Sequence, residues 1–131
     1  MSTHPTLTFV ALIATLVAAG CSKQPTARDI CSALETSGFA KGCREVKPEK
    51  LSARAAERYD FDLVSVPGKG AAVMSFAKDD DYEATVKMYE AAALFAGPHR
   101  YGSPKALVFV QASDELSLEE GKKLKAYVEG L

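Results

Sequence analysis

The chain has almost no net charge and few histidines or cysteines. Sixteen basic and 17 acidic residues among 131 give a formal net charge of −1, so no strong positive field would attract nucleic acid. Beyond the first 21 residues only one histidine and two cysteines remain, too few for a structural zinc site of the Cys/His type. We therefore expect no nucleic-acid partner, no metal and no other cofactor.

Several signatures of catalysis and ligand binding are also missing. The segment Gly68 to Gly70 lacks the spacing of a phosphate-binding loop, and the contiguous carboxylates Asp79 to Asp81 lack the alternate ligand positions of an EF-hand. No Gly-x-Ser-x-Gly elbow presents a serine nucleophile. Cys31 and Cys43 are too far apart for the Cys-x-x-Cys pattern of a thiol-active site. We assign no residue a catalytic role.

An apolar run near the start of the chain is the most informative feature present. Leu7 to Gly20 spans 14 residues, or about 21 Å of helix, which falls short of a bilayer core of roughly 30 Å. Its length is typical of the apolar region of a secretory signal peptide, and small residues precede the expected signal-peptidase cleavage site. The sequence therefore predicts that residues 1–20 are removed as an export signal.

The end of this run resembles the lipobox of bacterial lipoproteins. Ala19, Gly20 and Cys21 match the motif, whereas Ala18 stands where leucine is usual and the leader contains no Lys or Arg. The resemblance implies that Cys21 carries the lipid that anchors the mature protein to a bacterial membrane. Ser22 is similar to residues that direct such proteins to the outer membrane, where the host has one. Release as a soluble secreted protein and a retained membrane helix are the alternatives.

If Cys21 carries lipid, Cys31 and Cys43 are left as an even pair in an exported protein. Such a pair predicts a disulfide. For the loop between them, the chain-entropy model gives a stabilisation of about 3 kcal/mol. Residues 21–26 are expected to be a polar tether, and residues 27–131 a single globular domain.

The part after the leader predicts an α+β fold. Helical spacing and capping residues favour helices over 26–38, 79–97 and 117–131, with a shorter helical segment over 48–58. Alternation or a continuous apolar run favours strands over 59–66, 72–76 and 106–110. We therefore expect the order α-β-β-α-β-α, with a small three-stranded sheet covered by helices and Phe95 beside the inward face of the second long helix. If the second and third strands are parallel, their crossover should be right-handed.

The best candidate for a ligand-contact site is the loop that contains His99, Arg100 and Tyr101. His99 is the single histidine after the leader, and the loop precedes the most buried predicted strand. An imidazole beside a guanidinium could bind a phosphate or a carboxylate. Alternatively, Arg100 and Tyr101 pack and form hydrogen bonds across the loop.

Two further patterns could carry chemistry. Asp60 and Asp62 lie about 7 Å apart on one face of a predicted strand, a spacing near that of glycosidase carboxylates, although a solvent-facing edge explains them as well. A serine acting with His99 would be one of three: Ser65, Ser75 or Ser103.

These observations support three hypotheses about function. The first is a lipid-anchored protein of the cell envelope whose small non-catalytic domain binds a protein, peptide or glycan. The second is an envelope enzyme of hydrolase type that uses His99 and Arg100 on an anionic or ester substrate. The third is a structural or inhibitory lipoprotein that recognises a single partner.

Overall fold

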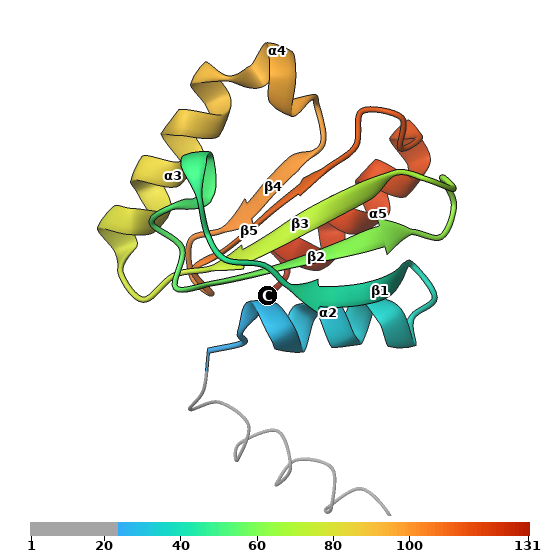
Figure 1. The fold of residues 1–131 in the computed structure, drawn as a ribbon, viewed down its shortest axis with the longest axis horizontal. Coiled ribbons are helices and arrows are strands. Elements are labelled where there is room, and N and C mark those ends of the chain that lie inside the picture. Colours follow the sequence, from blue (N-terminus) through green and yellow to red (C-terminus); the bar gives the residue numbers. More distant parts are fainter. Residues whose placement is uncertain (1–23) are drawn as a thin grey trace, which may run out of the picture.

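The computed structural model describes residues 24–131, which build a five-stranded antiparallel sheet with helices packed against it (Figure 1). The α+β class predicted from the sequence is confirmed. The expected signal over residues 1–20, Cys21 and the first tether residues lie outside the described residues. The elements in chain order are α2 (Ala27–Thr36), β1 (Ala40–Glu45), the 3-10 helix η1 (Lys50–Ser52), β2 (Glu57–Leu63), β3 (Gly70–Ser75), α3 (Asp79–Ala91), α4 (Ala93–Ala96), β4 (Arg100–Ser103), β5 (Val108–Ala112) and α5 (Leu118–Glu129).

The strands lie in the order β1-β2-β3-β5-β4, and every neighbouring pair is antiparallel. The prediction of three strands is therefore wrong. A parallel crossover does not arise either, because β3 pairs with β5 in antiparallel register. The two strands that sequence reasoning missed, β1 and β4, are the edges of the sheet. Both contain polar residues and glycine where the central strands β3 and β5 are mostly apolar, and β4 has only 4 residues.

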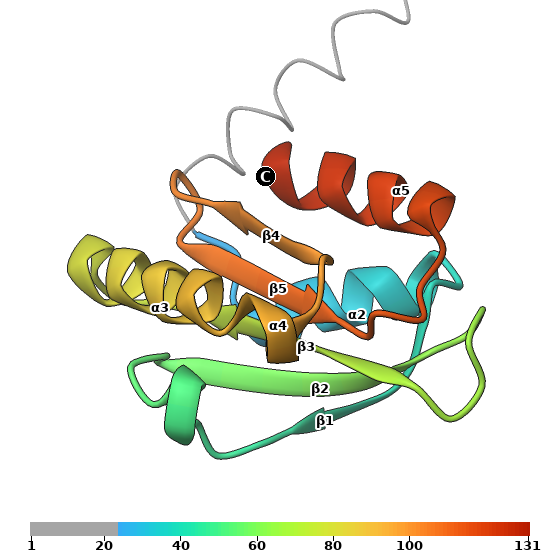
Figure 2. The same cartoon turned by 90° about the horizontal axis from the view of Figure 1, so that it is seen from above.

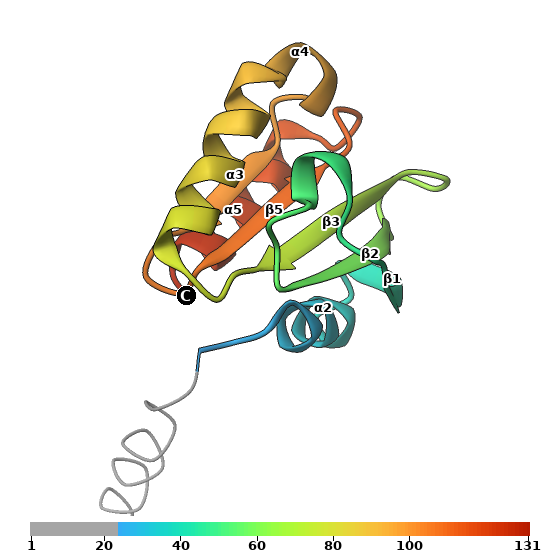
Figure 3. The ribbon, with the colours of Figure 1, turned by 60° about the vertical axis from the view of Figure 1, so that its left-hand side comes forward.

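Each face of the sheet has its own apolar core. On one face α2 packs against β1, β2 and β3, while α5 packs against β4 and β5; on the other, α3 packs against β5 and η1 (Figures 2 and 3). The central strands are buried on both sides, with Val73 and Val108 in the first core and Met74 and Phe109 in the second. This confirms the expectation that the apolar run over 106–110 is covered on both faces.

Helix α2 begins and ends where its capping residues predict. The Thr26 hydroxyl accepts the Asp29 amide N–H at 3.1 Å, and the Asp29 carboxylate accepts the Thr26 N–H at 3.0 Å. At the other end Gly38 adopts a φ of 83°, and the Phe39 N–H donates to the Leu34 carbonyl at 3.0 Å. This Schellman motif turns the chain sharply and sets the position of Phe39 at the entry to β1.

The long helix expected over 79–97 is interrupted. Helix α3 ends at Ala91, and Ala92 has a ψ of 21°, so α4 starts with a new orientation. Because the helical register does not continue through this turn, Ala96 faces the core and Phe95 is 94% exposed. The prediction that Phe95 lies beside the inward face is therefore wrong.

The segment 48–58 is mostly not helical. Only Lys50–Ser52 forms a turn of 3-10 helix, and β2 already begins at Glu57. The predicted β-hairpin is confirmed, because β2 pairs with β3 in antiparallel register from Glu57 opposite Ser75 to Asp62 opposite Gly70.

Candidate functional site

His99 lies immediately before β4 and is only 2% exposed. Its Nε2 is 2.7 Å from the Leu116 carbonyl oxygen, and its Nδ1 is 2.7 Å from the Tyr101 hydroxyl. A neutral ring satisfies both contacts when Nε2–H donates to the carbonyl and the tyrosine hydroxyl donates to Nδ1. Both ring nitrogens are thus used inside the fold.

Helix α5 packs directly over this imidazole because residue 121 is glycine. A Cβ at Gly121 would lie 2.5 Å from His99 Cε1 and Nδ1 and 3.0 Å from the Tyr101 hydroxyl. Sequence reasoning did not single out Gly121. A glycine inside an otherwise good helix, which costs about 1 kcal/mol relative to alanine, was the available signal for such a close approach.

Arg100 is also engaged by backbone groups. Its Nε donates to the Gly97 carbonyl at 2.8 Å, and its Nη1 donates to the Tyr89 carbonyl at 3.3 Å. Gly97 follows α4 and Tyr89 lies in the last turn of α3, where helix carbonyls lack partners within the helix. Burial raises the pKa of Tyr101, and the negative charge of Glu129 adds to this rise.

The structure therefore brings His99 and Tyr101 together on the α5 side of the sheet, whereas the Arg100 side chain bonds to backbone carbonyls on the α3 side. Two of the three serines considered as nucleophiles have other contacts: Ser75 Oγ accepts the Ala27 N–H at 3.0 Å, and Ser103 Oγ accepts the Ala106 N–H at 3.1 Å. The third, Ser65, is exposed in the turn between β2 and β3. The contacts of His99, Arg100 and Tyr101 thus connect β4 with α5 and with the ends of α3 and α4.

The sulfurs of Cys31 and Cys43 are joined in a disulfide that ties α2 to β1, with the two Cα atoms 6.1 Å apart. The Glu35 carboxylate accepts the Cys43 N–H at 3.1 Å beside it. Within residues 24–131 these three side chains form a group whose ligand atoms lie within 4.8 Å of one another. The disulfide removes both thiolates, however, so the group has no ligand set for a metal.

The sequence suggested that Asp60 and Asp62 lie on a solvent-facing edge of the sheet. The structure differs, because β2 is flanked by β1 and β3. Asp60 forms an ion pair with Arg58 at 2.8 Å, and Asp62 pairs with Arg44 at 3.4 Å. Arg58 also donates to the Ser52 hydroxyl at 3.0 Å. Each carboxylate thus has its own guanidinium partner.

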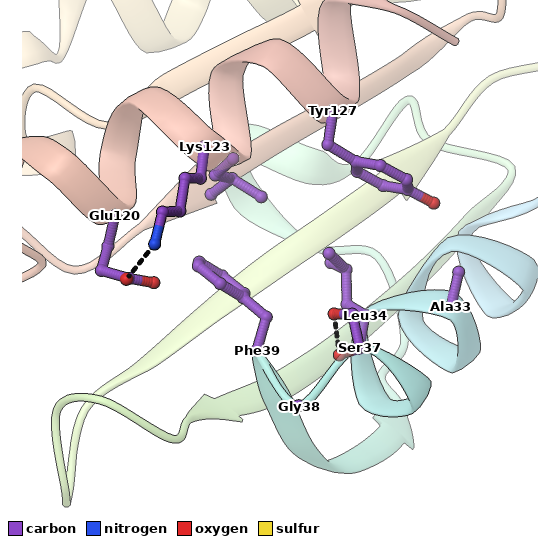
Figure 4. A pocket seen from close by; sticks show the side chains of 9 residues that line it. Ala33, Leu34, Ser37, Gly38, Phe39, Glu120, Lys123 and Tyr127 are labelled. Carbon is purple, nitrogen blue, oxygen red and sulfur yellow. Dashed lines mark hydrogen bonds and ion pairs between the residues drawn. The ribbon is translucent and has the colours of Figure 1, made fainter.

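A groove of about 430 Å³ opens between the C-terminal half of α2 and α5 (Figure 4). It exists because α2 covers β1 to β3 and α5 covers β4 and β5, which leaves the space between the two helices unfilled. Sequence reasoning missed this groove because its two walls are distant in the chain. The side chains that define it are Leu34, Phe39, Glu120, Lys123, Leu124 and Tyr127.

The groove combines apolar walls with a few polar groups. The rings of Phe39 and Tyr127 project into the space between the helices (Figure 4). Lys123 forms an ion pair with Glu120 at 3.3 Å on the same helix, and these charges are exposed enough to rearrange. Burial raises the pKa of Tyr127 above the usual 10.0, and its neutral hydroxyl can donate a hydrogen bond.

No family model, curated protein or solved structure matches this chain. Within residues 24–131, no helix is long and apolar enough to cross a membrane.

Proposed function

We propose that this protein is a lipid-anchored, non-catalytic binding protein of the cell envelope, and that the groove between α2 and α5 is its ligand site. The observation that carries the proposal is the contrast between His99 and the groove. A general base must reach a proton of the substrate, whereas His99 is buried and both its nitrogens have internal partners. The groove, in contrast, is open and is lined by aromatic and charged side chains.

The groove suits a short peptide with an apolar or aromatic side chain. Its volume of about 430 Å³ falls within the range of roughly 300–1,000 Å³ typical of small-ligand sites. Phe39, Leu34 and Leu124 supply apolar surface, and the Lys123–Glu120 pair can receive a charged group at one side. We favour a peptide over a glycan because the apolar side chains of Phe39, Leu34 and Leu124 make up much of the lining, and the Ser37 hydroxyl already donates to the Leu34 carbonyl at 2.8 Å.

The ligand site is tested by titrating the protein with blocked tripeptides that have a central Phe, Leu or Tyr flanked by acidic, neutral or basic residues. We expect NMR shift changes at Phe39 and Tyr127, and acidic peptides should bind more weakly to the Lys123→Glu variant. Lys122→Glu is the matched control, since Lys122 is exposed on the same helix but does not line the groove. Equal effects of both variants, or shifts confined to other surfaces, would contradict the assignment.

The anchor is tested separately by cell fractionation. The Cys21→Ser variant should leave the membrane fraction, because the lipid-bearing thiol is lost. Ala18→Leu restores the leucine usual in lipoboxes and should stay membrane-bound. A Cys21→Ser protein that remains in the membrane fraction argues for a retained helix instead.

The rival function is a hydrolase that uses His99 and Arg100 on an anionic or ester substrate. A panel of ester and phosphoester substrates, applied to the wild-type protein and to His99→Ala, separates it from the binding function. We expect no turnover that depends on His99. Turnover that disappears in His99→Ala while the unfolding transition stays unchanged would establish the enzyme.

A further inference from the structure

The edge strand β4 leaves the backbone of Gly102 without a partner. The His99 carbonyl accepts the Ala112 N–H at 2.9 Å, so the residues of β4 and β5 that exchange hydrogen bonds are 99 with 112, 101 with 110 and 103 with 108. The N–H and C=O of Gly102 and the C=O of Arg100 therefore point away from β5, along the free edge of the outermost strand (Figure 2). Among residues 24–131 no other group bonds to them.

A pocket of about 250 Å³ lies on the α3 side of this strand edge and is called the edge pocket below. One stripe of α3 and the neighbouring strands β4 and β5 form its lining: Tyr82, Val86, Glu90, Arg100, Gly102 and Phe109. Its volume is below the roughly 300–1,000 Å³ typical of sites for a whole small ligand, so it suits a single side chain. Because Gly102 has no side chain, nothing from β4 separates its backbone from the edge pocket.

The Tyr82 hydroxyl lines the edge pocket and has no hydrogen-bond partner among the described residues. Tyr82 is only 7% exposed, and its ring packs edge-on against Phe76 with the ring centres 5.7 Å apart. A Cβ at Gly102 would overlap the hydroxyl, which places this group directly over the free backbone. Burial raises the pKa of Tyr82, so the neutral hydroxyl can both donate and accept. A nearly buried side chain with an unpartnered polar end indicates that a ligand group meets it there.

We propose that β4 and the edge pocket bind an extended peptide segment of a partner protein, which adds to the sheet as an antiparallel strand and places an uncharged hydrogen-bonding side chain, such as that of Thr or Gln, beside the Tyr82 hydroxyl. The peptide residue opposite Gly102 exchanges two backbone hydrogen bonds with it. Residues opposite each other in a sheet project to the same face, so this residue's side chain enters the edge pocket. Glu90 and Arg100 both border the pocket, so neither an acidic nor a basic side chain is favoured.

A second copy of the chain fits this edge less well than a peptide does. Pairing β4 with itself around Gly102 would place Pro104 opposite Arg100, and proline has no N–H for the Arg100 carbonyl. The glycine of the second copy would also leave the edge pocket empty. The other edge of the sheet offers no equivalent site, because the register of β1 shifts between Lys41 and Arg44. The inference depends neither on the lipid anchor nor on the groove between α2 and α5.

The backbone part of the proposal is tested by NMR titration with acetylated and amidated pentapeptides Thr-Val-Xaa-Val-Thr, in which Xaa is Thr, Gln, Leu, Asp or Lys. We expect the Gly102 amide to exchange its proton rapidly in the free protein and to become protected by the Thr and Gln peptides, with weaker effects of the other three. Methylating the Xaa nitrogen should abolish binding, because its N–H donates to the Gly102 carbonyl. Methylating the nitrogen of the next Val, which points away from β4, is the matched control and should leave the affinity unchanged.

The edge pocket is tested by removing the Tyr82 hydroxyl. Tyr82→Phe keeps the ring, so the variant should fold normally, and it should weaken the Thr and Gln peptides about fivefold, the effect of one hydrogen bond. Its affinity for the Leu peptide should be unchanged. Tyr89→Phe is the matched control, because Tyr89 lies on the same helix and its hydroxyl contacts Met74 Sδ instead of the edge pocket. Equal effects of the two variants would overturn the inference.

Three results of the titration would also overturn it. The first is a Gly102 amide that no peptide shifts or protects, or equal binding of the peptide methylated at Xaa. The second is a Gly102 amide already protected in a dimer without peptide, which would make a second copy the occupant of the edge. The third is a set of shifts confined to Phe39 and Tyr127, which would place the peptides in the groove between α2 and α5 and support that site alone.

Discussion

Replacing Gly121 with alanine tests how closely α5 packs on His99. In an unconstrained helix this change would stabilise the protein by about 1 kcal/mol, because alanine has the higher helix propensity. Here the new methyl group would lie 2.5 Å from two atoms of the His99 ring and 3.0 Å from the Tyr101 hydroxyl. Such contacts are far shorter than van der Waals distance, so either α5 or the imidazole must shift.

The size of the effect follows from two opposing contributions. Overpacking a filled core costs about 1–3 kcal/mol, and the atoms struck here belong to a buried ring held at both nitrogens. We place the cost at about 2–3 kcal/mol, which outweighs the propensity gain of about 1 kcal/mol. The Gly121→Ala variant should therefore lose about 1–2 kcal/mol of unfolding free energy.

Urea unfolding followed by circular dichroism measures this difference. Ala126→Gly is the matched control, because it exchanges the same two residue types at an exposed position of α5 and should cost about 1 kcal/mol through propensity alone. If Gly121→Ala raises the free energy of unfolding by the amount that Ala126→Gly lowers it, position 121 is unconstrained and the packing argument is wrong.

Three further predictions concern the rest of the domain. Removing the disulfide with Cys31→Ser and Cys43→Ser together should cost about 3 kcal/mol of unfolding free energy, and the wild type should show no free thiol at these positions under denaturing, non-reducing conditions; labelling of both would refute the bond. Val108→Asp should abolish folding, because Val108 is fully buried in the central strand β5 and an unpaired carboxylate there costs several kcal/mol; a cooperative unfolding transition like that of the wild type would contradict this. Burial raises the pKa of Tyr82, Tyr89, Tyr101 and Tyr127 above the usual 10.0, so the unfolded chain loses these protons first. The urea midpoint should therefore fall as the pH rises above about 10, and a midpoint that holds or rises there would contradict the direction of the shifts.

The elements that the sequence predicted well have strong local signals. Helix α2 has a capping box at Thr26 and a left-handed glycine at Gly38, and β2 alternates in hydrophobicity and pairs with β3 across a turn. The apolar run over 106–110, which leads into β5, could be recognised from the sequence because it is buried on both faces of the sheet. In each case the residues that determine the element lie within a few positions of it.

The features that were missed depend on tertiary context. The edge strands β1 and β4 carry no clear hydrophobic alternation because they consist mostly of polar residues and glycine, and the register of β1 shifts between Lys41 and Arg44. The turn at Ala92 has no proline or glycine, so nothing local announces that Phe95 leaves the buried face. The His99 loop was recognised by residue type, but its hydrogen bonds to Leu116 and Tyr101 depend on how α5 and β4 meet.

The central claim, a lipid-anchored binding protein whose mature chain starts at Cys21, is tested most directly by the intact mass of the protein extracted from membranes. The account predicts a chain that has lost residues 1–20 and gained two or three acyl groups on Cys21. An unmodified Cys21 in a soluble product, or a full-length precursor in the cytosol, would contradict it.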